Sequence, residues 1–555
     1  MKRNFFSLLI LGVVSALAST AAAKPNVLLI CIDDLKPVLH CYGDATAKSP
    51  NIDALAARGV LFESAYCNQA VCSPSRNTLM TSLRPQTLGI YDLGTHFRLA
   101  APDAVTLTQH FKENGYRAEG MGKILHVGHG NIDDAASWSV PSWKSKMPTY
   151  MLPESTSSTR PSKSGGPRGS ATESAPVEDE AYGDGDTANE AVRRIQAAAQ
   201  HPEQPFFIAV GFIRPHLPFV APKKYWDMYD PATLPMPQVT EPPQGAPEYA
   251  PQFGGELRQY SDMPTVGPID AANTRNLIHG YYAAMSYTDA QIGKVIAALN
   301  AAGLDKNTVI VLWGDHGWHL GDHSMWCKHT NYEQAAHIPL IVAAPGKAAG
   351  AKTTAMVETA DIYPTLSDLA GLPARSGLDG RSFAPVLDDP TKAARDYVIH
   401  VYPRGDRLGR AIRGPRYRFV EWKVPGAEPE TAEYELYDYQ DDPLETKNLA
   451  AAMPDVITEM RALLASHPEA KPQIKVKASK GESKAAAKPK GKSSTKDRHA
   501  MFRSRDKDGD GRLSKEEFLL NQPDPDQAPA RFPSFDANKD GFLSEEEFVK
   551  SGKVK

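Results

Sequence analysis

The chain has 555 residues, with 62 Lys plus Arg against 66 Asp plus Glu and a formal net charge of −4. This balance argues against a nucleic-acid-binding or membrane-surface protein, so any electrostatic function has to be local. The length allows three or four domains, or one large α/β core with appendages. The five cysteines are too few for a disulfide scaffold, and their odd number leaves at least one thiol free for chemistry.

The first 23 residues have the pattern of a secretory signal peptide. A basic start precedes an apolar run over residues 5–18, and small residues follow at Ala21 and Ala23. A retained N-terminal anchor is the alternative. No later stretch has the roughly 18 apolar residues that a membrane span needs. We therefore expect an exported protein, periplasmic or secreted, without a stable membrane span.

The Cys72-Ser73-Pro74-Ser75-Arg76 segment opens a predicted helix. The first turn of a helix offers free backbone N–H groups and the positive end of the helix dipole, and Arg76 adds a planar cation suited to a tetrahedral oxyanion. The segment therefore predicts an anion site with Cys72 as its free thiol. The alternative is a buried, inert cysteine before an ordinary helix.

Acidic side chains follow two fully apolar runs. Residues 26–32 end in Asp33 and Asp34, and residues 308–313 are followed by Gly314, Asp315 and His316. Such runs are typical of strands buried on both faces of a parallel sheet, and ligands bind at the carboxyl ends of such strands. Adjacent carboxylates repel each other, so they indicate a cation site, although an exposed acidic turn is the alternative.

Other basic or imidazole side chains are candidates for the same site: Arg214 and His216 follow the predicted strand 205–212, Lys123 and His126 lie three residues apart, and Lys328 precedes the predicted strand 338–343. Lone Lys and His residues are usually found on the surface, so Lys123 and His126 are a weak signal by themselves. The βα alternation predicts an α/β fold with a mostly parallel central sheet and helices on both faces.

Composition divides the chain into further parts. We predict a catalytic core over residues 24–370, in which the Ser-, Pro- and Gly-rich stretch 143–186 is a mobile insertion. Shorter strands over 371–468 indicate a small antiparallel subdomain. Residues 469–497 read as a Lys-rich solvated linker, with polyanion binding as the alternative.

Two twelve-residue segments in the last part, 498–555, match the EF-hand calcium loop. Gly511 and Gly541 allow the sharp turn, and Glu517 and Glu547 can close each site bidentately. A pair of loops that has lost calcium is the alternative. The predicted calcium residues are Asp506, Asp508, Asp510, Arg512, Glu517, Asp536, Asn538, Asp540, Phe542 and Glu547.

Residues 24 to about 465 resemble the type I, formylglycine-dependent sulfatases, in particular their iduronate-2-sulfatase-like members. The linker and the EF-hand pair lie outside this resemblance. Several motifs agree with that family in order and spacing: Pro25 to Ile30 with Asp33-Asp34, Cys41-Tyr42-Gly43-Asp44, Ser49-Pro50-Asn51-Ile52-Asp53, Gln69-Ala70-Val71-Cys72, Gly122-Lys123, Pro215-His216-Leu217-Pro218-Phe219 and Asp315-His316-Gly317-Trp318.

The resemblance implies the alkaline-phosphatase-like α/β/α sandwich of the sulfatases. It also implies that a separate formylglycine-generating enzyme oxidises Cys72 to Cα-formylglycine before the chain folds. One hydroxyl of the hydrated aldehyde would attack sulfur, and the other would expel sulfate by re-forming the carbonyl. A plain serine would stall after the first transfer.

By the same resemblance, one divalent cation would be bound, and Ca²⁺ is expected. The oxygen-rich ligand set suits a hard ion, but His316 is less typical of calcium and leaves the identity of the metal open. The cation would lower the pKa of the attacking hydroxyl. Its ligands would be Asp33, Asp34, Asp315, His316 and the modified Cys72.

The resemblance also assigns the remaining polar residues. Arg76 and Lys123 would stabilise the formylglycine, and Lys123 with Lys328 would bind the sulfate ester. His126 would deprotonate the second hydroxyl, and His216 would protonate or orient the leaving alcohol.

One departure from the family pattern concerns maturation. The family usually has Gly and then Arg after the motif threonine, whereas this chain has Thr81-Ser82-Leu83-Arg84. Both positions lie outside the Cys-x-Pro-x-Arg core, so we expect an effect on the efficiency of maturation and not on the nucleophile itself.

The expected substrate is a sulfated carbohydrate, with a uronate or another sugar sulfate in a polysaccharide fragment favoured. Two rival hypotheses remain at this point. One is a phosphonate or phosphate monoester hydrolase on the same fold. The other is an unmatured, calcium-dependent carbohydrate-binding protein.

Overall fold

The computed structural model describes residues 24–161, 167–474, 498–519 and 528–551. The predicted signal peptide lies outside these residues. Within them, no helix is both long enough and apolar enough to cross a lipid bilayer.

A seven-stranded sheet forms the centre of the molecule, in the order β12-β2-β11-β8-β1-β6-β4. The neighbours of β1, β6 and β8, are parallel to it, and β4 is parallel to β6. β11 is antiparallel to both β8 and β2, so the sheet is mixed but mostly parallel, as expected. The strands are β1 (Asn26–Ile32), β2 (Val60–Phe62), β4 (Arg117–Gly122), β6 (Phe206–Phe212), β8 (Thr308–Gly314), β11 (Leu340–Ala343) and β12 (Ala351–Thr353).

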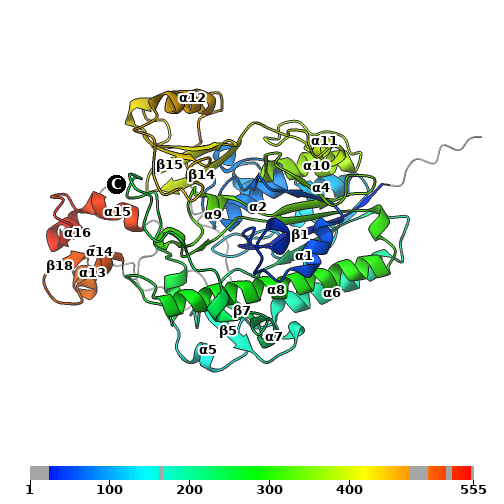
Figure 1. Cartoon of the computed structure of the whole chain (residues 1–555), viewed down its shortest axis with the longest axis horizontal. Helices are drawn as coiled ribbons and strands as arrows, with labels where there is room; N and C mark the ends of the chain where they lie inside the picture. Colours follow the sequence, from blue (N-terminus) through cyan, green and yellow to red (C-terminus); the bar gives the residue numbers. More distant parts are fainter. Residues whose placement is uncertain (1–23, 162–166, 475–497, 520–527, 552–555) are drawn as a thin grey trace, which may run out of the picture.

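Helices cover both faces of this sheet (Figure 1). Alternate residues of β1 explain why: Leu28, Ile30 and Ile32 belong to one buried cluster, and Val27, Leu29 and Cys31 to another. The first cluster lies under α1 (Pro50–Ala56), α6 (Gly183–Ala198) and α8 (Ala271–Ala301), and the second under α2 (Cys72–Thr81), α4 (Leu107–Glu113) and α10 (Ile362–Leu369). A strand buried on both faces has no polar face, which is why the run reads as continuously apolar.

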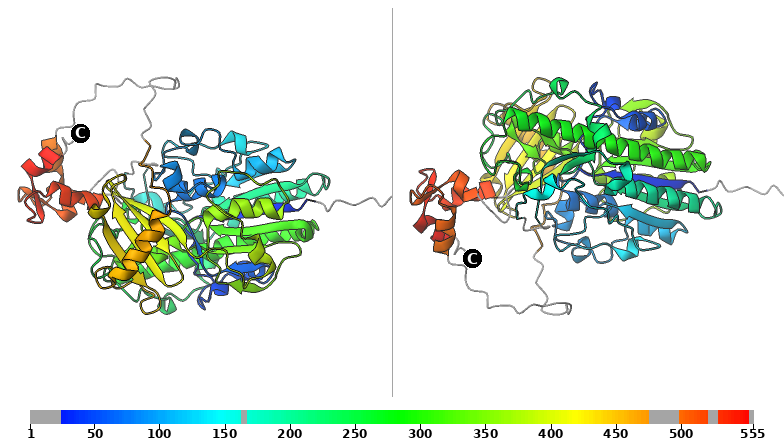
Figure 2. Two further views of the ribbon diagram at one scale, coloured as in Figure 1. Left: turned by 90° about the horizontal axis from the view of Figure 1, so that it is seen from above. Right: turned by 90° about the horizontal axis from the view of Figure 1, so that it is seen from below.

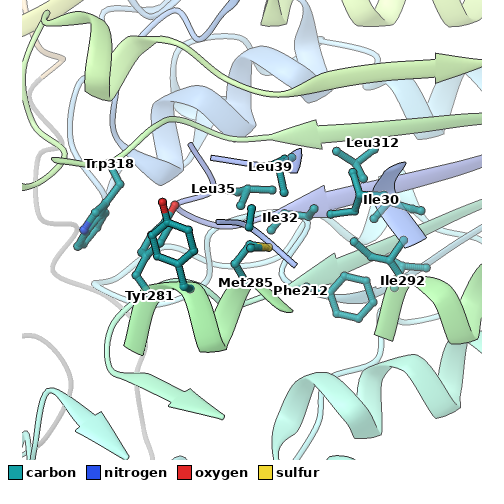
Figure 3. Close-up of a cluster of buried hydrophobic side chains, with 14 of the residues drawn as sticks. Ile30, Ile32, Leu35, Leu39, Phe212, Tyr281, Met285, Ile292, Leu312 and Trp318 are labelled. Carbon is teal, nitrogen blue, oxygen red and sulfur yellow. The ribbon is translucent and has the colours of Figure 1, made fainter. Parts of the chain in front are cut away.

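The long helix α8 also orients the end of β1. Figure 3 shows Tyr281 and Met285 of α8 beside Ile32 and Leu35. The Tyr281 hydroxyl donates to the Asp34 carbonyl oxygen at 2.7 Å and accepts from the Lys36 backbone N–H at 2.9 Å. The hydrophobic core therefore holds the loop that carries the two aspartates in one conformation.

The start of α1 is stabilised from a distant part of the chain. Ser49 occupies the cap position of this helix, and serine is a common capping residue, but its side chain makes no capping hydrogen bond. Asp289 of α8 takes that role instead, because its Oδ1 accepts from the backbone N–H groups of Asn51 at 3.1 Å and Ile52 at 2.8 Å. The cap comes from a residue far away in the chain.

The stretch 143–186, predicted to be a mobile insertion, contains regular secondary structure among its described residues. This stretch contains α5 (Glu154–Ser157) and β5 (Thr172–Ala175), and α6 already begins at Gly183. β5 is parallel to β7 (Phe219–Pro222), and its Glu173 is buried and accepts hydrogen bonds from the backbone of Met151 and Leu152. The polar composition of this stretch gives no sign of these contacts, because they are made with segments that are distant in the chain.

A second, four-stranded antiparallel sheet forms the predicted C-terminal subdomain. Its strands are β14 (Val398–Arg404), β15 (Arg407–Arg413), β16 (Tyr417–Lys423) and β17 (Glu433–Asp438), and α12 (Pro454–Ala465) packs on it. Beyond α12 the chain returns to the core, where the Lys471 N–H donates to Gln86 O at 3.0 Å and the Ile474 N–H to Gly89 O at 2.8 Å. Ordered structure thus extends past the predicted boundary at 468, and the rest of the predicted linker lies outside the described residues.

The C-terminal calcium-loop pair forms a separate body (Figure 2). It consists of α13 (Arg498–Arg505), β18 (Arg512–Ser514), α14 (Lys515–Leu519), α15 (Ala528–Phe535), β19 (Phe542–Ser544) and α16 (Glu545–Ser551). β18 and β19 pair through Leu513 and Leu543, both fully buried. One short antiparallel ladder therefore joins the two loops.

The remaining elements are short and connect these layers. They are β3 (Ala65–Tyr66), α3 (Pro85–Leu88), α7 (Lys223–Trp226), β9 (His319–Leu320), β10 (Trp326–Cys327), α9 (Glu333–Ala336), β13 (Val357–Glu358) and α11 (Ala384–Asp388).

Candidate functional site

The two acidic segments meet because β1 and β8 are adjacent and parallel. Ile32 is in register with Gly314, so Asp33 and Asp315 leave the sheet side by side. The Asp315 N–H donates to Ile32 O at 3.1 Å, and the Asp34 N–H donates to the Asp315 carboxylate at 3.0 Å. These carboxylates are fully buried. The sequence predicted this convergence, and the structure places the groups together.

Cys72 is the first residue of α2, and the helix directs it at this acidic centre. Its Sγ lies 3.4 Å from His316 Nε2. The whole helix is buried, and the backbone oxygen of Asp315 accepts a hydrogen bond from Ser75 Oγ at 2.5 Å, which fixes α2 against the end of β8.

Arg76 is held one helical turn further along α2. Its Nη2 lies 3.0 Å from Asp33 Oδ1, and its Nε donates to Asp315 Oδ2 at 3.0 Å. The side chain is fully buried. Arg76 therefore neutralises two carboxylates directly, and its guanidinium does not form the open oxyanion fork that the sequence suggested.

Two lysines complete the charge network from other strand ends. Lys123, after β4, forms an ion pair with Asp33, and Lys328 lies 3.0 Å from Asp34 Oδ1. The close approach after β4 depends on Gly122, because a Cβ there would lie 2.0 Å from the Gly211 carbonyl oxygen. Glycine is needed where two backbones come this close.

His216 follows β6 and points at the same centre. Its Nδ1 lies 2.6 Å from the Leu217 carbonyl oxygen, so the ring donates there, and its Nε2 lies 3.8 Å from Asp34 and 3.3 Å from Glu256 Oε1. Glu256 Oε2 also pairs with Lys328 at 3.0 Å. Glu256 thus links the two groups predicted to face the ester and its leaving alcohol.

His126 lies at the edge of this network. Its Nε2 is 3.1 Å from Nδ1 of the exposed His129, and its buried Nδ1 has no hydrogen-bond partner among the described residues. Burial first, and then the charge of Lys123, lower the pKa of His126 to about 2. The ring is therefore neutral and has a free nitrogen, but a pKa this low makes it a weak base, and an added negative charge beside it is needed to raise its proton affinity.

The carboxylates of the centre differ in their affinity for protons. Burial opposes ionisation of Asp33, but Lys123 and Arg76 hold its pKa well below the usual range. Burial raises the pKa of Asp34 and of Asp315 above the usual value, and the charge of Asp33 adds to both shifts. The centre therefore has excess negative charge, which a bound cation would relieve.

The donor set fits a divalent metal ion. Ligand atoms of Asp33, Asp34, Cys72 and His316 all lie within 4.8 Å of one another, and all four residues are buried. His316 Nδ1 lies 3.0 Å from the Gly317 carbonyl oxygen, so the proton belongs on Nδ1 and Nε2 is free to bind a metal.

Burial and the nearby Asp33 raise the pKa of the Cys72 thiol to about 12. A cysteine acts as a nucleophile through its thiolate, which this position disfavours. Unmodified Cys72 is therefore a poor nucleophile despite its central position.

The predicted EF-hand residues also converge. Asp506 accepts hydrogen bonds from the Gly509 and Gly511 N–H groups at 2.7 and 3.1 Å, and Asp536 accepts from Gly541 at 3.0 Å. Asp506, Asp508 and Glu517 offer oxygens within 4.8 Å of one another. Side chains of Asp510, Asn538, Asp540 and Glu547 belong to the same turns, and Arg512 and Phe542 hold the seventh position, whose main-chain oxygen is a calcium ligand in such loops.

Sequence reasoning missed Glu256 and Ser75. Glu256 lies in a Pro- and Gly-rich stretch without a motif, so no sequence signal marks it. Ser75 was noted only as part of the helix start, although its hydroxyl bonds the backbone of the second acidic segment.

Comparison with known proteins identifies the family. The sulfatase family model matches residues 25–372, more than half of the chain. The chain belongs to the sulfatase family. A model for the C-terminal part of N-sulphoglucosamine sulphohydrolase matches residues 321–469 of this sulfatase, and EF-hand models match 499–519 and 530–550.

Two curated relatives and one solved structure agree with this assignment. Human (Homo sapiens) iduronate 2-sulfatase is 31% identical over 515 residues, which cover 78% of this chain and 92% of the relative. The Mus musculus iduronate 2-sulfatase is 34% identical over 412 residues, 66% of this chain and 73% of the relative. The phosphonate monoester hydrolase from Silicibacter pomeroyi superposes with a TM-score of 0.65 at 25% identity, over 80% of this sulfatase and 95% of that chain.

Proposed function

We propose that this sulfatase hydrolyses sulfate esters of sugars, through a formylglycine made from Cys72 and a divalent cation held beside it. The observation that carries the proposal is the convergence of Cys72 with the carboxylates of Asp33, Asp34 and Asp315 and with His316. The family supports hydrolysis of sulfuric esters, and the donor set supports the cation.

Asp33, Asp34, Asp315, His316 and the modified Cys72 would hold the ion, for which Ca²⁺ is the expected species. When bound, it would withdraw charge from the sulfate oxygens and lower the pKa of a nearby hydroxyl. The formylglycine would supply, as a hydrated aldehyde, one hydroxyl for attack and one for release of sulfate.

The chain's own residues then divide the remaining work. Lys123 and Lys328, already next to the acidic centre, would bind the negative sulfate oxygens. His126 has a neutral ring with an unpartnered nitrogen and would take up the proton of the second hydroxyl. His216, with its Nε2 directed into the site and Glu256 beside it, would hold or deliver the proton for the leaving alcohol.

The substrate we favour is a uronate or related sugar sulfate, because the iduronate 2-sulfatases match this chain at 31% and 34% identity. The apolar N-terminal run supports export to the periplasm or outside the cell, where sulfated polysaccharides occur. The C-terminal loops would bind two further calcium ions, and maturation requires a formylglycine-generating enzyme as partner.

Mass spectrometry of the peptide containing Cys72 tests the proposal first. Conversion to formylglycine lowers the mass by about 18 Da, because one sulfur and two hydrogens are lost from the side chain and one oxygen is gained. The native protein should show the lighter peptide and release sulfate from an aryl sulfate. Cys72→Ala should remain folded and release none. A wholly unmodified thiol in protein from its own host would contradict the proposal and favour an unmatured carbohydrate-binding protein.

A phosphonate or phosphate monoester hydrolase is the second candidate, because such an enzyme superposes on this chain over most of its length. Turnover of matched aryl sulfate, aryl phosphate and aryl phosphonate esters separates the two. The proposal predicts the highest kcat/KM for the sulfate. A higher value for phosphate or phosphonate would replace it.

A further inference from the structure

Two loop segments that are distant in sequence, residues 167–171 and 256–263, are bonded to each other and form the wall segment discussed below. The Ser261 N–H donates to Gly169 O at 2.9 Å, and the Ala171 N–H donates to the Asp262 carboxylate at 2.8 Å. Arg160 also donates to the Met263 carbonyl oxygen at 3.0 Å. These bonds fix residues 167–171 against the segment that carries Glu256.

Arg168 lies in this wall segment, and some of the N–H donors of its guanidinium have no partner among the described residues. Its Nη1 donates to the Tyr260 hydroxyl at 2.6 Å, and the guanidinium lies over the Tyr260 ring, 5.0 Å from its centroid. A guanidinium offers five N–H donors. Among the described residues its only side-chain hydrogen bond is the one to Tyr260, and none of their carboxylates forms an ion pair with it. Arg76, by contrast, pairs with two.

The position of Arg168 follows from the turn that holds Tyr260. Glu256 and Tyr260 flank the 3-10 helix Leu257–Gln259, so their backbones are about one turn apart. Glu256 in turn contacts His216 and Lys328. The charge of Arg168 also helps to lower the pKa of Glu256 and that of His129, whose ring lies beside that of His126. Through Tyr260, Arg168 is therefore held about one turn of chain from Glu256, which contacts two groups proposed to act on the ester, and it lies outside the metal centre.

We propose that Arg168 binds the carboxylate of a sulfated uronate whose sulfate occupies the centre. This inference rests on the proposed sulfatase function and adds a specificity-determining residue to it. The planar fork of Arg matches a carboxylate with two parallel hydrogen bonds, and Tyr260 preorganises it. A neutral sugar would leave a half-buried guanidinium without its anionic partner, so the enzyme should discriminate against it.

The test compares one substrate with its own ester. The probes are a 4-methylumbelliferyl glycoside of a 2-O-sulfated uronic acid and the carboxyl methyl ester of that glycoside. Wild type should prefer the free acid. In Arg168→Ala the kcat/KM ratio of acid to ester should fall by about 10- to 100-fold, the range of a charge-assisted hydrogen-bonded pair. Arg168→Lys should keep part of the preference, because it retains the charge but not the fork.

Matched variants separate recognition from folding. Tyr260→Phe keeps the ring and loses the hydroxyl, so the ratio should fall less than in Arg168→Ala. Arg160→Gln changes a second arginine, which binds backbone carbonyls of the wall segment, and should lower the melting temperature and both rates without changing the ratio.

Two results would overturn the proposal. One is an acid-to-ester ratio that Arg168→Ala leaves unchanged. The other is a selective loss on a disulfated amino sugar without a carboxylate, which would assign Arg168 to a second sulfate. Failure of the sulfatase function itself would be recognised separately, because wild type would then release no sulfate from a simple aryl sulfate either.

Discussion

The catalytic centre and the C-terminal calcium loops both collect acidic side chains, but they compensate the negative charge differently. In the centre, Asp33 and Asp34 are fully buried and face Arg76, Lys123 and Lys328. In the loops, acidic groups such as Asp508 are exposed, and the carboxylates are satisfied mainly by backbone N–H groups of their own turn. Fixed cationic side chains offset part of the negative charge of the first cluster, whereas solvent and backbone N–H groups of the same turn stabilise the carboxylates of the second.

This difference bears on how each cluster depends on metal. The central carboxylates are assembled by the parallel sheet and by α8, so their geometry forms with the core. The loop carboxylates repel each other with no buried cation between them, so ion binding and ordering of the loop are coupled. We therefore expect the core to be stable without calcium and the C-terminal pair to gain most of its stability from it.

Removing the guanidinium of Arg76, on α2, should have the largest effect on the stability of the core. Arg76→Gln leaves Asp33 and Asp315 buried without their shared partner, which should reduce the free energy of unfolding by about 3–5 kcal/mol. Urea denaturation measures this, and added calcium should recover part of the loss. Arg193→Gln, which removes an exposed ion pair with Glu190, is the matched control and should cost less than about 1 kcal/mol. If both variants lost the same free energy of unfolding, the buried cation would not have the special role that the comparison assigns to it.

Two truncations should separate the regions. Ending the chain after residue 468 removes the hydrogen bond from the Tyr91 hydroxyl to Lys471 O at 2.6 Å and that from the Lys471 N–H to Gln86 O at 3.0 Å. It also removes the buried Ala470, and the core should lose about 2–3 kcal/mol. Ending after 474 removes the whole C-terminal pair and should leave unfolding of the core and aryl sulfate turnover unchanged. A large loss from the second cut would show that the pair supports the core.

Acid should weaken the centre before it weakens the loops. The pKa of His126 falls from 6.5 to about 2, mainly because the ring is buried, so the folded state favours neutral His126. Its stabilising contribution is complete above pH 6.5 and is lost as the pH falls below it. At pH 5 the wild type should lose about 1–2 kcal/mol relative to His126→Gln, as measured by urea denaturation at pH 7.5 and 5.

The loop glutamates titrate at lower pH. The Ser544 hydroxyl and backbone N–H groups lower the pKa of Glu547 below 4.5, so its contribution is present above pH 4.5 and lost below it. Fluorescence or circular dichroism of the isolated core and of the full chain would resolve the two transitions. A C-terminal pair that melts near pH 6 would contradict this order.

The smallest effect on the core should come from the calcium loops themselves. Glu517→Gln and Glu547→Gln each remove a closing carboxylate, and calcium affinity of the affected loop should fall by more than about tenfold. Isothermal titration should then show one fewer tight site for each variant. Unfolding of the core should change by less than about 0.5 kcal/mol, as for surface changes in general. The Glu516→Gln neighbour, an exposed residue of the same turn, is the control.

Much of the site was predictable because local patterns encode it. Apolar strands with acids at their ends identify where side chains leave a parallel sheet, and the helix start at Cys72 identifies what faces them. The order of strands was not predictable in the same way, and neither was the antiparallel orientation of β11, since Leu340 to Ala343 would fit either direction. Glu256 could not be found because its role depends only on where its loop lies.

The sequence by itself determined the fold class, the two calcium loops and the residues that converge on Cys72, because these depend on periodicity and on fixed spacings along the chain. Tertiary structure decided how the charges are shared. It placed Arg76 between two carboxylates, Asp289 at the start of α1 and Arg168 against the Tyr260 hydroxyl. These pairings join residues far apart in the chain, and burial makes each of them strong, so no local pattern could have shown them.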